Sequence, residues 1–205
     1  MRRTRLVFGL ALCIAAAVWG QAGDAPGAAD PDIRMVRLGD RAAVLQVGGE
    51  SFTNTIVLAS ARGLVVIDTG QLPSLGPALR AAAERAFGRT DIALVINTHA
   101  HFDHIDGNQA FAGIPIVAHA KAERQMRQWY GSPAAIAAFV RNRVNWRTRE
   151  ENRLQSLPAD SPDVVRTRAA LANDAAMVDD FRQGRFRLTL PTITFTDRLS
   201  LDLGD

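Results

Sequence analysis

The chain has 205 residues, of which 47% are hydrophobic and 22% are charged, a balance typical of one globular domain with a sizeable core. Its single cysteine, Cys13, excludes a fold that is held together by disulfides within the chain. The sequence also contains no internal repeat, phosphate-binding glycine loop or Gly-x-Ser-x-Gly elbow, which argues against repeat proteins, loop-type nucleotide hydrolases and serine hydrolases.

The N-terminus has the three parts of a secretory signal peptide. Arg2, Arg3 and Arg5 precede an apolar run from Leu6 to Trp19, and small residues follow as far as Ala22. The apolar run is short for a membrane span, so we predict a cleaved signal peptide over residues 1–22 and a periplasmic or secreted protein. An uncleaved membrane anchor is the alternative, whereas cleavage would leave no stable anchor.

Cleavage would change the charge balance of the chain. The 24 basic and 21 acidic residues become 21 of each, because residues 1–22 contain three arginines and no acids. The basic excess then disappears, so we expect no nucleic-acid partner. Residues 23–32 are rich in Ala, Gly, Asp and Pro, and we interpret them as a flexible leader.

The segment that follows the leader predicts strands first and then alternating strands and helices. Turn signals and β-branched residues predict strands over residues 33–38, 42–47, 53–59 and 64–68. Apolar residues from Leu75 to Ala86 share one helical face, and Gly88 is a stop signal. A buried strand is predicted over Ile92–Asn97, and a short one over Ile114–Ala118.

Three of the four histidines lie within six positions directly after the buried strand, together with a carboxylate: His99, His101, Asp103 and His104. Imidazole nitrogens and carboxylate oxygens are ligands that zinc prefers. In extended backbone His99 and His101 point the same way, whereas Asp103 and His104 need a turn before both point inward. We therefore predict a loop at the carboxyl end of a strand that serves two neighbouring metal ions.

Two other interpretations of this cluster are open. One is a polar surface loop in which the histidines have no common role. The other is a structural site for a single metal ion, which is disfavoured because structural zinc prefers cysteine and Cys13 lies in the predicted signal peptide.

The motif His99-x-His101-x-Asp103-His104, after Asn97-Thr98, resembles the metal motif of the metallo-β-lactamase superfamily. Residues 65–70 before it and 106–108 after it are similar to that family as well. The resemblance implies an α/β fold, namely the N-terminal portion of an αββα sandwich over residues 33–205. From Lys121 to Arg187 the residue character changes, and we interpret this stretch as a helical insertion between the histidines and the next strand.

The resemblance also implies roles for individual residues. His99 and His101 would bind a first zinc ion, and Asp103 and His104 a second, with Asp103 also orienting the nucleophile as the catalytic residue. Asp68 matches an aspartate that supports the metal loop, although a turn-forming Asp in Asp-Thr-Gly explains it equally well.

The implied function is that of an exported zinc-dependent hydrolase. Such an enzyme would use a metal-activated hydroxide on a small-molecule lactam, lactone, ester or thioester. One alternative is a true metallo-β-lactamase of the type that lacks a cysteine ligand. Another alternative is a truncated, non-catalytic metal-binding protein.

The predicted insertion is rich in arginine and contains few aromatic residues. Ser161-Pro162-Asp163 predicts a helix start, and apolar residues recur at helical spacing until Gly184. The arginines could steer an anionic substrate, but a solvated helix face is the favoured interpretation. The large aromatic residues of this region would either wall a substrate pocket or pack the insertion onto the sandwich: Trp129, Tyr130 and Trp146.

Two further expectations concern the end of the domain. His119 follows a strand, and a hydrogen-bonded structural role is favoured over metal ligation. Thr192–Asp202 predicts a strand that turns into a hairpin. In the family, a hairpin of this kind precedes further zinc ligands, and none occurs before Asp205. We therefore expect an incomplete C-terminus, with the remaining ligands beyond it.

Overall fold

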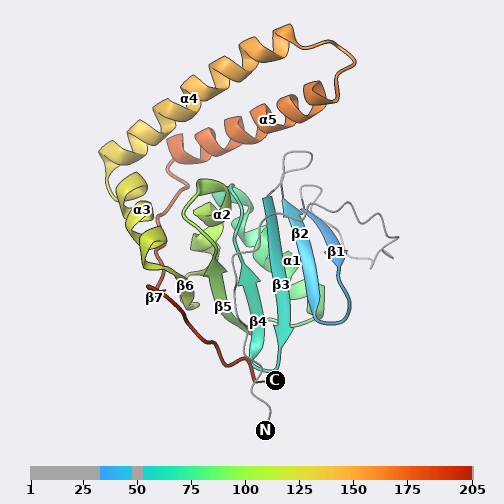
Figure 1. Ribbon diagram of the computed structural model, residues 1–205, viewed down its shortest axis with the longest axis vertical. Helices are drawn as coiled ribbons and strands as arrows, with labels where there is room; N and C mark the ends of the chain where they lie inside the picture. The colour runs from blue at the N-terminus through green and yellow to red at the C-terminus, as the bar shows by residue number, and fades with distance from the viewer. Residues whose placement is uncertain (1–32, 48–52, 205) are drawn as a thin grey trace.

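The computed structural model describes residues 33–47 and 53–204 (Figure 1). The predicted signal peptide and leader lie outside the described residues. One sheet of seven strands runs through the described part, with the strands in the same order in space as in the sequence. The strands are β1 (Ile33–Arg37), β2 (Ala42–Val47), β3 (Thr53–Ser60), β4 (Gly63–Ile67), β5 (Ile92–Asn97), β6 (Ile116–His119) and β7 (Ile193–Phe195).

The helical segments lie between or after the strands. They are η1 (Pro73–Leu75), α1 (Gly76–Phe87), α2 (Phe102–Ile105), η2 (Asp106–Phe111), α3 (Ala120–Tyr130), α4 (Pro133–Ser156) and α5 (Pro162–Arg182). Helix α1 packs against strands β1 to β4. Within the described ranges no helix has the length and apolar character needed to cross a membrane.

The sheet changes from antiparallel to parallel at β4. Strands β1 to β4 form an antiparallel meander, whereas β4 to β7 pair in parallel. The carboxyl ends of β4, β5 and β6 therefore lie at one edge of the sheet, where open α/β sheets place their ligand sites. Asp68 follows β4 and the histidine loop follows β5, so the topology brings the two segments together.

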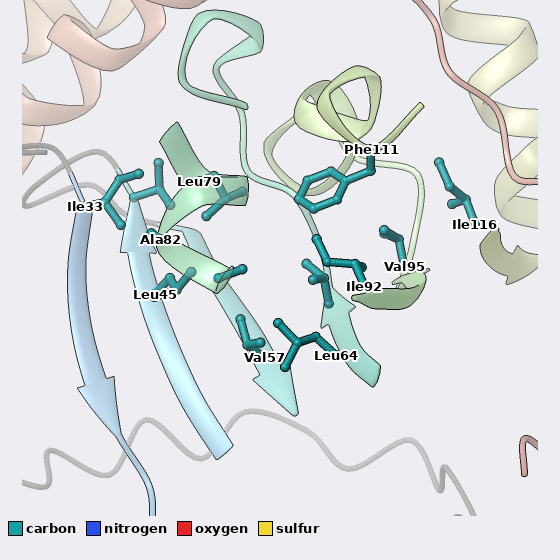
Figure 2. Packing of buried hydrophobic residues seen from close by; sticks show 13 residues of the cluster. Ile33, Leu45, Val57, Leu64, Leu79, Ala82, Ile92, Val95, Phe111 and Ile116 are labelled. Atoms are coloured by element: carbon teal, nitrogen blue, oxygen red, sulfur yellow. The ribbon is translucent and has the colours of Figure 1, made fainter. Parts of the chain in front are cut away.

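The main hydrophobic core lies between the sheet and α1 (Figure 2). Alternate residues of β2 point into it: Ala43, Leu45 and Val47. Helix α1 contributes Leu79 and Ala82 from its buried face, and η2 adds the fully buried Phe111. The helix ends where Gly88 adopts a left-handed conformation with φ 62°, which confirms the predicted stop.

The opposite face of the meander is also apolar, but it is only partly covered. Val44 on β2 pairs with Ile56 on β3, and Leu58 lies two positions further along β3. Ile56 is 37% exposed as a residue, whereas Leu45 on the core face is 0% exposed. The two faces of these strands therefore differ in burial more than in composition.

Helices α4 and α5 form a long antiparallel pair that projects from the sheet (Figure 1). Near its base, a second hydrophobic cluster joins α3 and α5 to the histidine loop. It contains the buried Tyr130 and Phe181, whose rings lie 6.2 Å apart. Helices α3, α4 and α5 cover most of residues 121–187, for which the sequence predicts helices, and α5 begins at the predicted Ser161-Pro162.

The strand predicted within Thr192–Asp202 is confirmed over Ile193–Phe195, whereas the predicted turn into a hairpin is wrong. Only Ile193–Phe195 form a strand, which pairs with β6 alone, and residues 196–204 are not in a strand. Strand β6 has only four residues and therefore offers few partners. Beyond it, the chain is held by an ion pair between Arg62 and Asp202, 2.7 Å apart, rather than by a returning strand.

Candidate metal centre

The three histidines after β5 come together in the structure. The ring of His99 lies 4.5 Å from that of His101 and 4.2 Å from that of His104, measured between centroids. His101 has extended backbone and precedes α2, a single helical turn that carries Asp103 and His104. This short helix supplies the turn that the sequence predicts for Asp103 and His104.

Asp68 connects the turn after β4 to the histidine loop. Its Oδ1 accepts a hydrogen bond from the Thr98 amide at 2.8 Å, and its Oδ2 accepts from the Thr98 hydroxyl at 2.7 Å. The same Oδ2 lies 2.7 Å from His104 Nδ1, which donates to the carboxylate. Asp68 is 5% exposed and has a left-handed backbone with φ 60°. These contacts are those that a supporting role requires, and that role stays a prediction.

The two turns are also joined backbone to backbone. The Thr69 amide donates to the His104 carbonyl at 2.9 Å, and the Gly107 amide donates to the Gly70 carbonyl at 3.4 Å. Gly107 packs so closely that an added Cβ would lie 2.0 Å from the Thr69 carbonyl oxygen. Only a residue without a side chain fits at this position.

A buried amide network lies beneath the loop. Asn108 Oδ1 accepts from Asn97 Nδ2 at 3.0 Å and from the Thr69 hydroxyl at 2.9 Å. Asn108 Nδ2 donates to Asn97 Oδ1 at 2.9 Å and to the Thr189 carbonyl at 3.1 Å. The sequence analysis gave no role to Asn97 or Asn108. The signal that could have found them is Asn97, an amide at the end of a buried strand, because a buried polar side chain requires hydrogen-bond partners.

The charges of the loop shift its pKa values in different directions. Burial lowers the pKa of His99, and the neighbouring His104 and His101 lower it further. Burial also opposes the charged form of His104, but hydrogen bonds and charges from Asp103 and Asp68 outweigh it and raise the pKa of His104 to about 9. Burial raises the pKa of Asp103, but the hydrogen bond and charge of His104, a backbone hydrogen bond and the charge of His101 together outweigh burial and lower it. Without metal, the loop therefore favours an anionic Asp103 beside a cationic His104.

Asp106 is a buried carboxyl group at the end of the same loop. It is 1% exposed, and within the described residues neither of its side-chain oxygens has a hydrogen-bond partner. Burial raises the pKa of Asp106 well above its usual value, and the nearby Asp103 and Asp180 raise it further. The group is therefore expected to be neutral, unlike Asp103.

The donor set of the loop fits zinc in its chemistry. It offers imidazole nitrogens and a carboxylate, and the bond from His104 Nδ1 to Asp68 leaves Nε2 as the nitrogen available to a metal. That Nε2 lies 3.5 Å from Asp103 Oδ2. However, within the described ranges no group of three His, Cys, Asp or Glu side chains is already arranged to hold one ion. The ligand roles of His99, His101, Asp103 and His104 stay predictions.

His119 lies at the end of β6 and has a structural role, as the sequence favours. Its Nδ1 accepts a hydrogen bond from the Lys121 amide at 3.0 Å and so caps the first turn of α3. Its Nε2 lies 2.8 Å from the Thr196 carbonyl, to which it donates. Both ring nitrogens are thus engaged away from the histidine loop.

A pocket of about 390 Å³ opens beside His101, between α2, α3 and α4. The His101 ring stacks on Trp129 of α3 at a centroid distance of 5.9 Å and an interplanar angle of 24°. The pocket is lined by aromatic and small residues with two amides: His101, Phe102, Gln128, Trp129, Tyr130, Ala135, Ala138, Phe139 and Asn142. Trp129 and Tyr130 thus wall a pocket, whereas Trp146 packs against Arg143 at 4.3 Å.

Solved structures that resemble the chain include several metallo-β-lactamases. The enzyme from Hirschia baltica has a TM-score of 0.40 and 23% identity, with 45% of this chain and 46% of that one covered. An enzyme from Cronobacter sakazakii with a HARLDQ motif has a TM-score of 0.35 and 30% identity, with 42% and 34% covered. The enzyme from Pontibacter korlensis has a TM-score of 0.40 and 16% identity, with 45% and 46% covered.

The matched region spans less than half the length of each of these structures. No curated protein matches the chain. The family model of the metallo-beta-lactamase superfamily matches residues 48–178, which is well over half of the 205 residues. This stretch includes the histidine loop, the turn that holds Asp68 and the helices that wall the pocket. The chain therefore belongs to the metallo-beta-lactamase superfamily.

Proposed function

We propose that the protein is an exported zinc-dependent hydrolase that acts on a small-molecule lactam, lactone, ester or thioester. The observation that carries the proposal is the convergence of three imidazole rings and one carboxylate at the carboxyl edge of the sheet. Membership of a superfamily whose members are generally hydrolases supports it. The signal-like residues 1–22 support export, and the even charge of the remainder is against a nucleic-acid partner.

The chain's own residues have separable tasks in this proposal. His99 and His101 would hold one zinc ion, and Asp103 and His104 a second. When bound, zinc would lower the pKa of water to near neutrality and polarise the substrate carbonyl. Asp68 keeps the proton on His104 Nδ1 and so presents Nε2 to the site. The anionic Asp103 can accept a hydrogen bond from the attacking water and orient it.

Hydrolysis forms a bond between the water oxygen and the carbonyl carbon and breaks the bond from that carbon to nitrogen, oxygen or sulfur. The proton lost by the water must reach the leaving atom. Asp103 is the side chain in the cluster that can carry it, because it is ionised and its partner His104 is held in place. Asp106 is buried, and burial raises its pKa well above the usual value, so we assign it no part in this transfer.

The proposal is tested by zinc content and turnover measured on the same samples. Protein refolded or dialysed with zinc is assayed for bound metal and then against nitrocefin, a lactone, a p-nitrophenyl ester and a thioester. His101→Ala should lose zinc and turnover together. His119→Asn is the matched control, since asparagine keeps a helix-capping side chain outside the loop.

The outcomes separate the candidate functions. Turnover of esters, lactones or thioesters supports the general hydrolase, and turnover of nitrocefin alone identifies a β-lactamase. Zinc uptake without turnover of the panel indicates a metal-binding protein that is not an enzyme. Zinc content unchanged in His101→Ala would overturn the assignment of the loop.

A further inference from the structure

We propose that the pocket beside His101 binds an uncharged, apolar substituent of the substrate, and that it selects substrates by that substituent. This inference rests on the proposed hydrolase function and deepens it. The pocket volume of about 390 Å³ is within the range of small-molecule sites, which is roughly 300–1,000 Å³. A pocket of this size holds a substituent of several carbon atoms rather than a methyl group.

The chemistry of the walls defines the class of occupant. Phe102, Trp129 and Phe139 provide aromatic surface, and Ala135 and Ala138 leave space on the side of α4. Among the described residues that line the pocket, none is Asp, Glu, Lys or Arg. A charged substituent would lose its hydration there without gaining a counter-charge, so an apolar one is favoured.

The position of the pocket connects it to the reaction. His101 is a predicted zinc ligand and also lines the pocket, and its ring stacks on Trp129. A substrate whose carbonyl lies at the histidine loop can therefore place a neighbouring group in the pocket without leaving the site. Gln128 and Asn142 are exposed and form the polar part of the rim.

The walls of the pocket are packed against neighbouring elements, which suits a selective site. Tyr130 is buried beneath the pocket and packs against Phe139 at 5.1 Å and Phe186 at 5.4 Å between ring centroids. Arg143 lies over Phe102 at 4.7 Å from its ring centroid and pairs with Asp174 on α5. Helix α4 is thus fixed on one side of the pocket by contacts that a substrate does not have to form.

The first test needs no activity. Metal-free, ¹⁵N-labelled protein is titrated with 1-hexanol, and the indole N–H signal of Trp129, assigned with Trp129→Phe, is followed by NMR. We expect saturable binding that Ala138→Trp weakens tenfold or more, because the new ring fills the pocket. Ala137→Trp is the matched control, since Ala137 is the exposed neighbour of Ala138 on α4 and does not line the pocket. The cationic 6-amino-1-hexanol should bind at least tenfold more weakly than 1-hexanol.

The second test uses whichever substrate class the panel shows to be hydrolysed. Methyl and hexyl derivatives are compared, with the alkyl group on the carbonyl side in one series and on the leaving group in the other. In one or other of the two series, kcat/KM should be about tenfold or more higher for the hexyl derivative than for the methyl derivative. Ala138→Trp should remove that increase while Ala137→Trp retains it. If Ala138→Trp does not fold, Ala135→Phe fills the same pocket.

The results that would overturn the hydrolase proposal differ from those that would overturn the pocket proposal. No turnover by any variant, with hexanol binding that Ala138→Trp abolishes, counts against the hydrolase and leaves the pocket as a binding site. Turnover without chain-length dependence in either series, or equal hexanol binding by the Ala138→Trp and Ala137→Trp variants, overturns the pocket proposal.

Discussion

At the scale of single residues, the geometry of the candidate centre depends on two positions with special backbone requirements. Asp68 has positive φ, a conformation that costs about 1–3 kcal/mol for a residue with a side chain. Its carboxylate receives three hydrogen bonds in return, two from Thr98 and one from His104. Gly107 has no space for even a methyl group beside Thr69.

Asp68→Asn should weaken zinc binding more than it weakens folding. Asparagine tolerates positive φ and has the same shape, but it lacks the charge that holds the proton on His104 Nδ1. We expect zinc affinity, measured by competition with a chromogenic chelator, to fall by about 10- to 100-fold. Asp91→Asn, at an exposed aspartate paired with Arg89, should leave the affinity unchanged. Equal affinities of Asp68→Asn and the parent protein would remove Asp68 from the site.

Gly107→Ala should destabilise the chain far more than Gly113→Ala. The methyl group at position 107 collides with backbone, so the two turns must separate, at a cost of at least about 2 kcal/mol in the free energy of unfolding. Gly113 has φ 86° and open space around it, so alanine there costs only backbone strain of about 1 kcal/mol. Urea denaturation of both variants measures the difference, and similar midpoints would contradict the close contact.

At the scale of elements, the α4–α5 pair is held at its base by a buried ion pair. Arg143 Nε and Asp174 Oδ1 lie 2.5 Å apart, and Asp174 Oδ2 has no hydrogen-bond partner within the described residues. Burial raises the pKa of Asp174, and the opposing effect of Arg143 does not cancel it. The folded chain therefore binds this proton more tightly than the unfolded chain does.

The raised pKa of Asp174 determines in which direction pH changes the free energy of unfolding. In the unfolded chain the pKa of Asp174 is about 3.9, and in the folded chain it is higher. The stability that Asp174 contributes is therefore fully present below the unfolded-state pKa and is lost as pH rises through the folded-state pKa. Relative to the parent, Asp174→Asn should thus become more stable as pH rises from about 3.5 to 7. Urea denaturation at both pH values measures this, and a constant difference would contradict it.

Asp179→Asn provides a control with the opposite sign. Hydrogen bonds from Arg185 and Gln183 lower the pKa of Asp179, so its contribution is present above the unfolded pKa and is lost as pH falls through the folded value. Relative to the parent, this variant should become less stable over the same rise in pH. The two aspartates lie on the same helix, which makes them a matched pair.

At the scale of the whole molecule, one face of the meander is packed against α1 and the other is partly open. Leu45→Ala should lower the free energy of unfolding by about 2–5 kcal/mol, because Leu45 is fully buried in the core. Ile56→Ala should cost less than about 1 kcal/mol, because Ile56 is 37% exposed. Equal losses in the two variants would show that the second face is also covered in solution.

Local patterns predict much of this architecture. The meander, the first helix and its glycine stop, the strand before the histidines and the start of α5 follow from alternation, periodicity and capping signals. Within Thr192–Asp202 only Ile193–Phe195 form a strand, because the partner strand β6 ends at His119, opposite Phe195, and the alternating pattern does not reveal this. The alternation of residues describes one segment of the chain, whereas the length of a strand also depends on the neighbouring strand with which it pairs.

The contacts around the candidate site depend on residues far apart in the sequence, and local pattern could not supply them. Asn108 reaches Asn97 and Thr189, and Trp129 reaches His101. The one-turn helix that carries Asp103 and His104 is too short to show periodicity. The identity of the cluster was visible in the sequence, but its amide support and the adjoining pocket were not.

The backbone bonds from Thr69 to His104 and from Gly107 to Gly70 fix the turn after β4 and the turn after β5 against each other. Each turn therefore has a required number of residues, because one inserted or deleted residue would move every later donor out of reach of its acceptor. The connection between α4 and α5, residues 157–161, is mostly exposed and can vary in length. Relatives that share this centre should accordingly differ in the reach of their helical arm while keeping both turns unchanged in length.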